Sequence, residues 1–139
     1  MSQTLAKLPS TEKALLALLQ AVAADTTVTP EMLGGDFAFD PATMAFYIQI
    51  ARVPGGRSTR LQGDTLVDID VFAQDYGTAD SVSFAIEALL LGYPHVVEVD
   101  GRKVVLDNVY QNAAPAELPW EDDSTFRIGS TYSITVRRH

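Results

Sequence analysis

Four aspartates lie within the stretch DIDVFAQDYGTAD (68–80), and carboxylates at this density can bind a metal ion or exchange protons. Asp68 and Asp70 are two residues apart, so on a β-strand their carboxylates share one face, roughly 7 Å apart. Such a pair can hold Mg²⁺, which binds through few protein ligands. An EF-hand would need an oxygen ligand and a glycine where this chain has Phe72 and Ala73. We therefore expect a strand with one wet face, with a two-carboxylate metal site as the alternative.

The rest of the chain offers few groups for catalysis. There is no cysteine, which excludes disulfide and thiolate chemistry. The two histidines, His95 and His139, are too far apart in the sequence for a zinc motif, and His95 is interpreted as structural. The chain contains neither a G-x-S-x-G nucleophile motif nor a phosphate-binding loop. We predict that the protein is not an enzyme, has no catalytic or metal-ligating residues and needs no cofactor.

Length and charge narrow the class of protein further. A chain of 139 residues with 47% hydrophobic content fits one domain, 1–139, with its own core. The formal net charge of -8 disfavours nucleic-acid binding, so contact with DNA would need a local basic patch. The apolar run 14–24 is far shorter than the ~20 residues that cross a bilayer, so we expect no membrane partner.

Arginines gather in one short part of the chain. Arg52, Arg57 and Arg60 lie in or beside the Gly-rich segment 54–64, which is predicted to be an exposed loop. One interpretation is a solvated loop. The other is an arm that contacts phosphate or an acidic protein surface.

Apolar residues at helical spacing predict two helices. The first begins at Ser10 or Thr11, whose hydroxyls suit a helix N-terminus, and ends near Asp25. The second covers 80–91 and follows a turn at 75–78.

The ends of the second helix have their own signals. Thr78 or Asp80 is expected to cap its start, and Gly92 is placed to end it. Phe84 and Leu91 lie outside its apolar stripe. A helix with this excess of apolar residues indicates a second partner, so both are candidate interface residues.

Alternating apolar residues predict strands at 46–53, 65–73 and 126–138, and Asp100-Gly101 predicts a hairpin over 95–110. The remaining segments, 30–45 and 111–125, are expected to be loops. The sequence therefore predicts an α+β fold. It has a mainly antiparallel sheet of about four to five strands, with two helices packed on one face.

Trp120 precedes an acidic run, 121–123, in the second of these loops. An exposed tryptophan at such a place is a candidate contact anchor, because tryptophan is favoured at interface hot spots. The alternative is that Trp120 folds back and covers the sheet.

The order of elements resembles the tail terminator (tail completion) proteins of long-tailed bacteriophages. The resemblance covers most of the chain apart from 25–45 and 111–125. It rests on the stretches TEKALLALL (11–19), FYIQIARVPGGRSTRLQGDTLVDIDVFAQD (46–75), SVSFAIEALL (81–90) and FRIGSTYSITVRR (126–138).

This resemblance implies a structural virion protein without catalytic residues. It implies an α+β subunit in a hexameric ring that caps the tail tube, ends tail polymerisation and joins the tail to the head connector. The loop 54–64 would face the channel, with passing contact with DNA, or an adjacent ring. Strand 65–73 and helix 80–91 would form subunit contacts. The protein would be assembled in the host bacterial cytoplasm and reside in the virion tail.

Three other functions remain open from the sequence. The first is a head-completion or connector ring. The second is a small metal-dependent cytosolic enzyme that uses Asp68 and Asp70. The third is an acidic binding module that grips a basic partner through Trp120 and the acidic loop.

Overall fold

The computed structural model describes residues 11–20, 30–53, 62–120 and 124–138. Within these residues six strands form one sheet in the order β1-β2-β3-β6-β5-β4, and only the pair β1–β2 is parallel. The elements in chain order are α1 (Thr11–Leu19), the 3-10 helix η1 (Pro30–Met32), β1 (Leu33–Gly34), β2 (Tyr47–Val53), β3 (Gln62–Ala73), α2 (Tyr76–Leu91), β4 (His95–Val99), β5 (Arg102–Leu118) and β6 (Phe126–Arg138).

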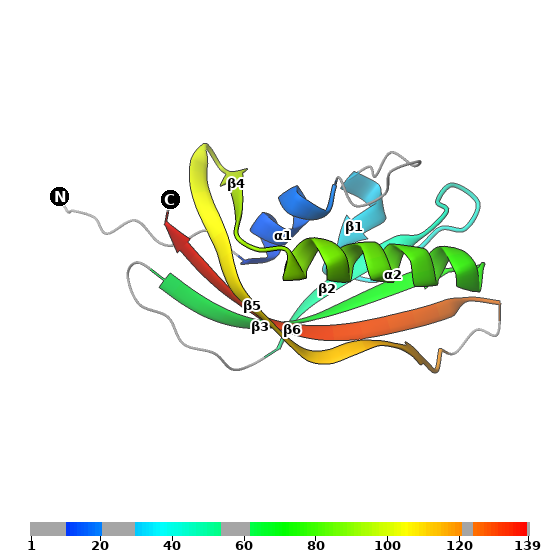
Figure 1. Cartoon of the computed structure of the whole chain (residues 1–139). Coiled ribbons are helices and arrows are strands. Elements are labelled where there is room, and N and C mark those ends of the chain that lie inside the picture. The colour runs from blue at the N-terminus through cyan, green and yellow to red at the C-terminus, as the bar shows by residue number, and fades with distance from the viewer. Residues whose placement is uncertain (1–10, 21–29, 54–61, 121–123, 139) are drawn as a thin grey trace.

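The sheet curls into a half-barrel, and both helices lie on its inner face (Figure 1). Helix α2 packs across β3, β6 and β5, whereas α1 packs against β4 and β2. The predicted α+β class, the mainly antiparallel sheet and the two helices on one face are confirmed. The sheet has more strands than expected, because the predicted loop 30–45 contains the short strand β1.

Strand β3 shows the alternation that the sequence predicts. Val67, Ile69 and Val71 are buried in the core under the helices, at 0–1% exposure. Asp68 and Asp70 are half-buried and point to the outer face. The alternation of the two faces is thus confirmed, but the outer face is less wet than predicted, because the Asp70 side chain is only 13% exposed and Phe72 on the same face is buried.

Strand β5 corrects the expected loop 111–125. It continues to Leu118 and pairs with β6 down to the Leu118–Arg127 position. Proline normally ends a central strand because it has no N–H to donate. Here Pro115 lies within one of three register shifts, between Ala113 and Ala116, where the pairing with β6 is already interrupted. The bulges therefore let the strand pass through a segment that is rich in loop signals.

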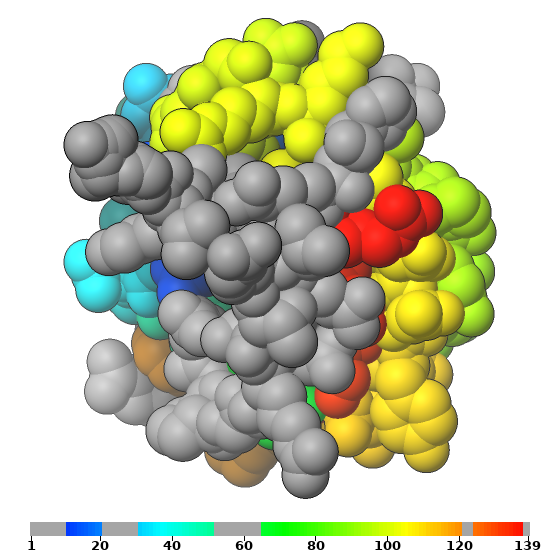
Figure 2. Space-filling model, turned by 90° about the vertical axis from the view of Figure 1, so that its left-hand side faces the viewer, coloured from blue at the N-terminus to red at the C-terminus, as the bar shows by residue number. Residues whose placement is uncertain are grey.

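The predicted hairpin turn is confirmed. Asp100 and Gly101 have φ angles of 52° and 78°, which is the left-handed backbone that a two-residue turn between β4 and β5 requires. Aspartate and glycine tolerate this conformation, so the local sequence determines the turn. Figure 2 shows the hairpin at the top of one end of the molecule, with the end of β6 beside it.

Helix α2 begins earlier than predicted. Asp75 is its N-cap: the carboxylate accepts hydrogen bonds from the Thr78 backbone N–H and hydroxyl, both at 3.0 Å. The predicted turn at 75–78 and the caps Thr78 and Asp80 are therefore wrong, because Asp75 supplies the acceptor one turn sooner.

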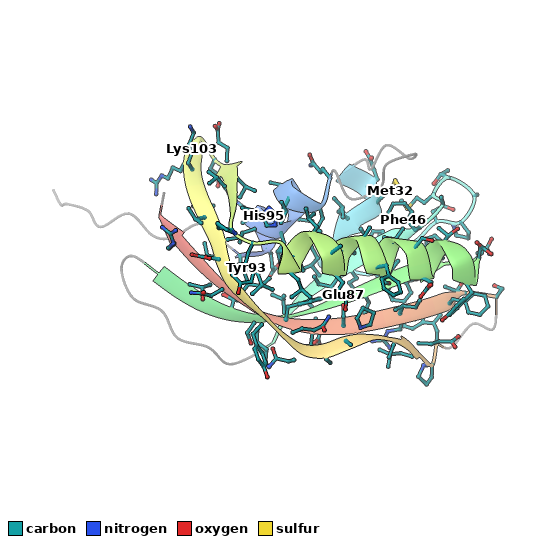
Figure 3. The ribbon with its side chains drawn as sticks, viewed as in Figure 1. Met32, Phe46, Glu87, Tyr93, His95 and Lys103 are labelled. Carbon is teal, nitrogen blue, oxygen red and sulfur yellow. The ribbon has the colours of Figure 1, made fainter. Side chains whose placement is uncertain are left out.

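The other end of α2 agrees with the prediction. The Gly92 N–H donates to the carbonyls of Ala88 and Leu89, so Gly92 ends the helix. An imidazole nitrogen of His95 lies within hydrogen-bond distance of the same Leu89 carbonyl, and this contact gives the histidine a structural role. Figure 3 shows His95 near this end of α2.

Helix α1 begins at Thr11, whose hydroxyl is 2.8 Å from that of Thr65 on β3. The helix ends at Leu19. The predicted alternative start at Ser10 and the predicted end near Asp25 lie outside the described residues.

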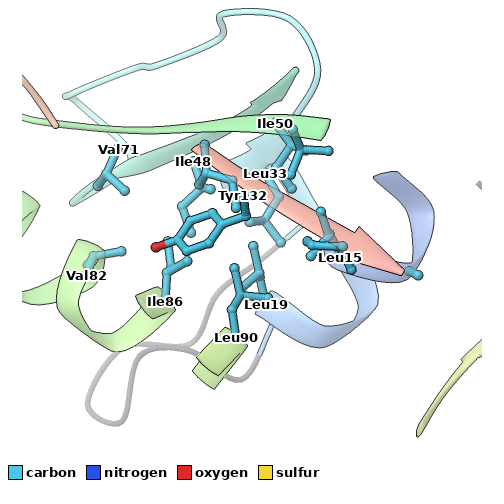
Figure 4. Packing of buried hydrophobic residues seen from close by; sticks show 14 of the residues in the cluster. Leu15, Leu19, Leu33, Ile48, Ile50, Val71, Val82, Ile86, Leu90 and Tyr132 are labelled. Carbon is cyan, nitrogen blue, oxygen red and sulfur yellow. The ribbon is translucent and has the colours of Figure 1, made fainter. Parts of the chain in front are cut away.

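Both helices contribute to one hydrophobic cluster with the inner face of the sheet (Figure 4). Tyr132 of β6 is fully buried beneath α2, and its phenol oxygen is 3.4 Å from the Gln111 side-chain nitrogen. Other buried members of the cluster are Leu15, Leu19, Leu33, Ile48, Ile50, Val71, Val82, Ile86 and Leu90.

Candidate interaction surfaces

The two strand aspartates are both used by the fold on the outer face of the sheet. Asp70 Oδ2 accepts from Arg127 Nη2 at 2.9 Å and from Arg127 Nε at 3.2 Å. The two side chains of this ion pair are only 13% and 29% exposed. Asp68 Oδ1 accepts from the Thr131 hydroxyl at 2.6 Å. Strand β6 therefore supplies partners for both carboxylates.

Burial sets the protonation behaviour of Asp70. Desolvation is the largest effect and raises the pKa of this carboxyl above its usual value, with a smaller contribution from the Asp68 charge. The bond to Arg127 acts in the opposite direction. Among the described residues, no three His, Cys, Asp or Glu side chains gather in a group that could hold a metal ion.

Divalent metal is therefore expected to have no effect on stability. Millimolar Mg²⁺ or Mn²⁺ should leave the melting temperature unchanged, since a ligand stabilises a protein only when it binds the folded state. Thermal unfolding of the same sample with and without EDTA measures this. If the melting temperature rises with metal concentration, and Asp68→Asn abolishes this rise, the protein has the two-carboxylate metal site after all.

The arginine surface predicted around 54–64 remains a prediction. Arg57 and Arg60 lie outside the described residues. Arg52 is in β2, opposite Val67 of β3, but its side chain also lies outside the described part.

Helix α2 presents an apolar seam on the side away from the sheet. Phe84 is 62% exposed and Leu91 43% exposed, so these two predicted interface residues lie on the surface of the chain. Gly77, Ser81 and Ala88 are exposed on the same side. Together the five residues repeat at intervals of four and three, the spacing that lets one helix pack along another element. Sequence reasoning found the two large residues but not the small ones that complete the seam.

Strand β5 borders this seam with an open sheet edge. The Gln111 side-chain nitrogen donates to Glu87 of α2 at 2.6 Å, which ties the helix to the strand. Beyond residue 106, β5 pairs only with β6, so its other edge is unpaired within the described residues. Pro115 and the bulges interrupt this edge, and such interruptions discourage the addition of a foreign strand. Contacts at this flank therefore depend on side chains.

Trp120 folds back and covers the sheet, as one of the two interpretations of the sequence predicts. Its ring centroid lies 4.8 Å from that of Phe72 and 5.0 Å from that of Phe37, and it is half-buried. The Arg127 guanidinium lies 5.6 Å from the same indole ring. Trp120 thus shields the Asp70–Arg127 pair. The sequence alone did not reveal this cluster, because Phe37 joins it from the predicted loop 30–45.

Comparison with known proteins finds a similar fold in a solved structure. The chain is similar in structure to one chain of the virion of a native gene transfer agent (GTA) particle, with a TM-score of 0.57 and 14% sequence identity. The similarity covers 89% of this chain and 95% of that chain. No family model and no curated protein sequence matches the chain. Within the described part, no helix is long and apolar enough to span a membrane.

Proposed function

We propose that this chain is a structural protein of a phage-like virion. In this proposal residues 1–139 act as one tail-terminator-like unit that forms a ring, caps the tail tube, ends its polymerisation and joins the tail to the head connector. The protein is assembled in the bacterial cytoplasm and remains in the tail. The observation that carries the proposal is the shared fold with a chain of the GTA virion over nearly the full length of both chains.

The α2 seam supports assembly through a protein contact. Phe84 and Leu91 are large apolar side chains that water surrounds in the single chain, and a neighbouring subunit would cover them. Symmetric pairing of two copies of α2 would bring the acidic side chains Asp80 and Glu87 of one helix close to those of the other, and like charges across an interface disfavour this pairing. The seam therefore fits a heterologous contact with a different surface of the next copy, which is the contact type that closes rings.

A test of ring formation is native mass spectrometry of the purified chain, alone and with tube protein. We expect a closed ring of identical subunits, formed by the chain alone or only on the tube. Phe84→Ser should weaken ring formation by about tenfold or more, as expected for an interface anchor. Tyr110→Ser is the matched control, because Tyr110 is a similarly exposed aromatic residue (67%) on the outer face of the sheet.

Two outcomes separate the alternatives. A ring that binds portal protein and ignores tube protein would identify a head-completion or connector ring. A chain that stays monomeric with both partners would contradict the ring proposal. In the assembled ring, Arg52, Arg57 and Arg60 are proposed to face the channel or an adjacent ring, and passing contact with DNA would depend on them.

A further inference from the structure

Aromatic side chains gather at the end of the sheet where β3 ends and β6 begins. On the outer face, Phe37 packs against Trp120 and is still 44% exposed. On the helix side, Tyr76 packs edge-on against Phe126 with ring centroids 5.7 Å apart, and Tyr76 is 45% exposed. The two pairs are neighbours, because Phe72 and Ala73 of β3 pair with Arg127 and Phe126 of β6. We call Phe37, Tyr76, Trp120 and Phe126 the aromatic end.

Acidic side chains surround the aromatic end. Asp36 directly precedes Phe37. The backbone carbonyl of Asp36 accepts a hydrogen bond from the hydroxyl of Tyr47, the first residue of β2. Asp75 is the exposed N-cap of α2, and Glu117 is exposed beside the end of β5. Among the described side chains at this end, the one cation is Arg127, and Asp70 already neutralises it.

The opposite end of the sheet has a different character. Arg102 and Lys103 follow the β4–β5 turn, and Arg137 lies on the same level of the sheet, paired with Val105. Figure 2 shows this end, and Figure 3 shows Lys103 at the hairpin, far from the start of α2. The described charges therefore differ along the strands. At the hairpin end cations and acids are mixed, and Lys13 pairs with Asp100 and Arg137 with Asp107. Beside the aromatic end, Asp36, Asp75 and Glu117 have no such ion pair within the described residues.

From this arrangement we infer that the aromatic end docks a basic segment of a different protein. The segment carries Arg or Lys side chains beside apolar ones. Its cations would lie against Asp36, Asp75 and Glu117 and over the exposed aromatic faces, which attract cations, while its apolar side chains cover Phe37 and Tyr76. The acids repel phosphate groups, so the charge pattern selects a protein and not a nucleic acid. The inference does not rest on the proposed ring, because the surface is complete in one chain.

The test uses the full-length isotope-labelled chain and NMR spectroscopy. The probe is a short synthetic peptide of alternating arginine and leucine, and the control peptide has glutamate in place of arginine. We expect amide shifts to cluster at 36–37, 75–76, 117–120 and 126–127 with the arginine peptide only. The affinity should fall with added salt, since the flanking charges are exposed.

Two variants sharpen the assignment. Phe37→Ser should weaken the binding of the arginine peptide by about tenfold, whereas Tyr110→Ser should leave the affinity unchanged. Because Phe37 packs in the cluster, the double variant Asp36→Asn/Glu117→Gln provides a second test that leaves the aromatic packing in place.

Shifts centred on the β4–β5 hairpin, equal binding of the glutamate peptide, or full affinity of the double variant would each overturn the inference. Self-stacking of the chain, seen as a mass that grows with concentration and is abolished by Phe37→Ser, would also overturn it. Ring formation is measured separately, so either result stands without the other.

Discussion

Ile86→Ala is expected to destabilise the protein by about 2–5 kcal/mol, the range for removing a large aliphatic side chain from a packed core. Ile86 is 1% exposed and lies at the centre of the buried face of α2, against Tyr132 and between Val82 and Leu90 (Figure 4). The rigid sheet beneath the helix cannot collapse into the space, so the loss of transfer free energy is joined by the cost of a cavity. Urea unfolding with an unchanged m-value measures the difference.

Phe84→Ala on the same helix is the matched control. Phe84 is two residues away but on the opposite side of α2, so its removal should change the free energy of unfolding by less than about 0.5 kcal/mol. Alanine also has a higher helix propensity than phenylalanine, which slightly raises the stability of the variant. Both variants must be compared as monomers. Equal destabilisation by the two substitutions would show that another part of the chain covers the seam, and the proposed subunit contact would lose its basis.

The contrast between these two residues shows what periodicity can predict. Val82, Ile86 and Leu90 recur at the 3.6-residue helical spacing and are buried, and the same repeat isolates Phe84 and Leu91, which are exposed. The same holds for β3, where the two-residue repeat separates three buried apolar residues from the two aspartates. Both patterns are local, and burial of one face is enough to enforce them.

The features that were missed depend on contacts between distant segments. The continuation of β5 past Tyr110 is invisible in its own sequence, because Pro115, Pro119 and the acidic run 121–123 indicate a loop. What holds this segment in the sheet is β6, which offers a partner strand along its whole length. A local signal for irregular structure was overridden by tertiary pairing, and the bulges show where the two requirements conflict.

The two candidate interaction surfaces also show that local features are predictable from the sequence, whereas contacts between distant segments are not. The seam on α2 was half predicted, since large exposed residues stand out in a sequence whereas Gly77 and Ser81 do not. The aromatic end was not predicted, because it combines residues from four separate segments. The sequence indicates Trp120 as a candidate because of its residue type, but only the fold brings Phe37, Phe72 and Arg127 next to it. Gly129 of β6 fits the packing on this face, because a Cβ there would lie 2.5 Å from the Leu118 side chain and 2.7 Å from an Asp70 oxygen.

Arg127→Gln is expected to destabilise the protein by about 1–3 kcal/mol near neutral pH, because it leaves the Asp70 carboxylate with a poorer partner in a place where water is largely excluded. The Trp120 ring also loses its cation. The effect should depend on pH. Burial already raises the pKa of Asp70 above the unfolded value of 3.8, and Arg127 is the group that opposes this rise. Without the guanidinium, the folded pKa moves further upward.

The direction of the pH dependence follows from proton binding. Between the unfolded pKa and the raised folded pKa, the folded state binds more protons than the unfolded state, so stability falls as pH rises through this window. The window is wider in Arg127→Gln, so the variant should lose more stability than the wild type between an acidic and a neutral pH.

Asp70→Asn supplies the control background. With no carboxylate at position 70, adding Arg127→Gln should cost less, and the cost should no longer change with pH; a double-mutant cycle at both pH values measures the coupling. A cost of Arg127→Gln that is identical at the two pH values would mean that Arg127 acts through its packing on Trp120. In that case the ion pair would contribute little, and the aromatic cluster alone would hold this end of the sheet together.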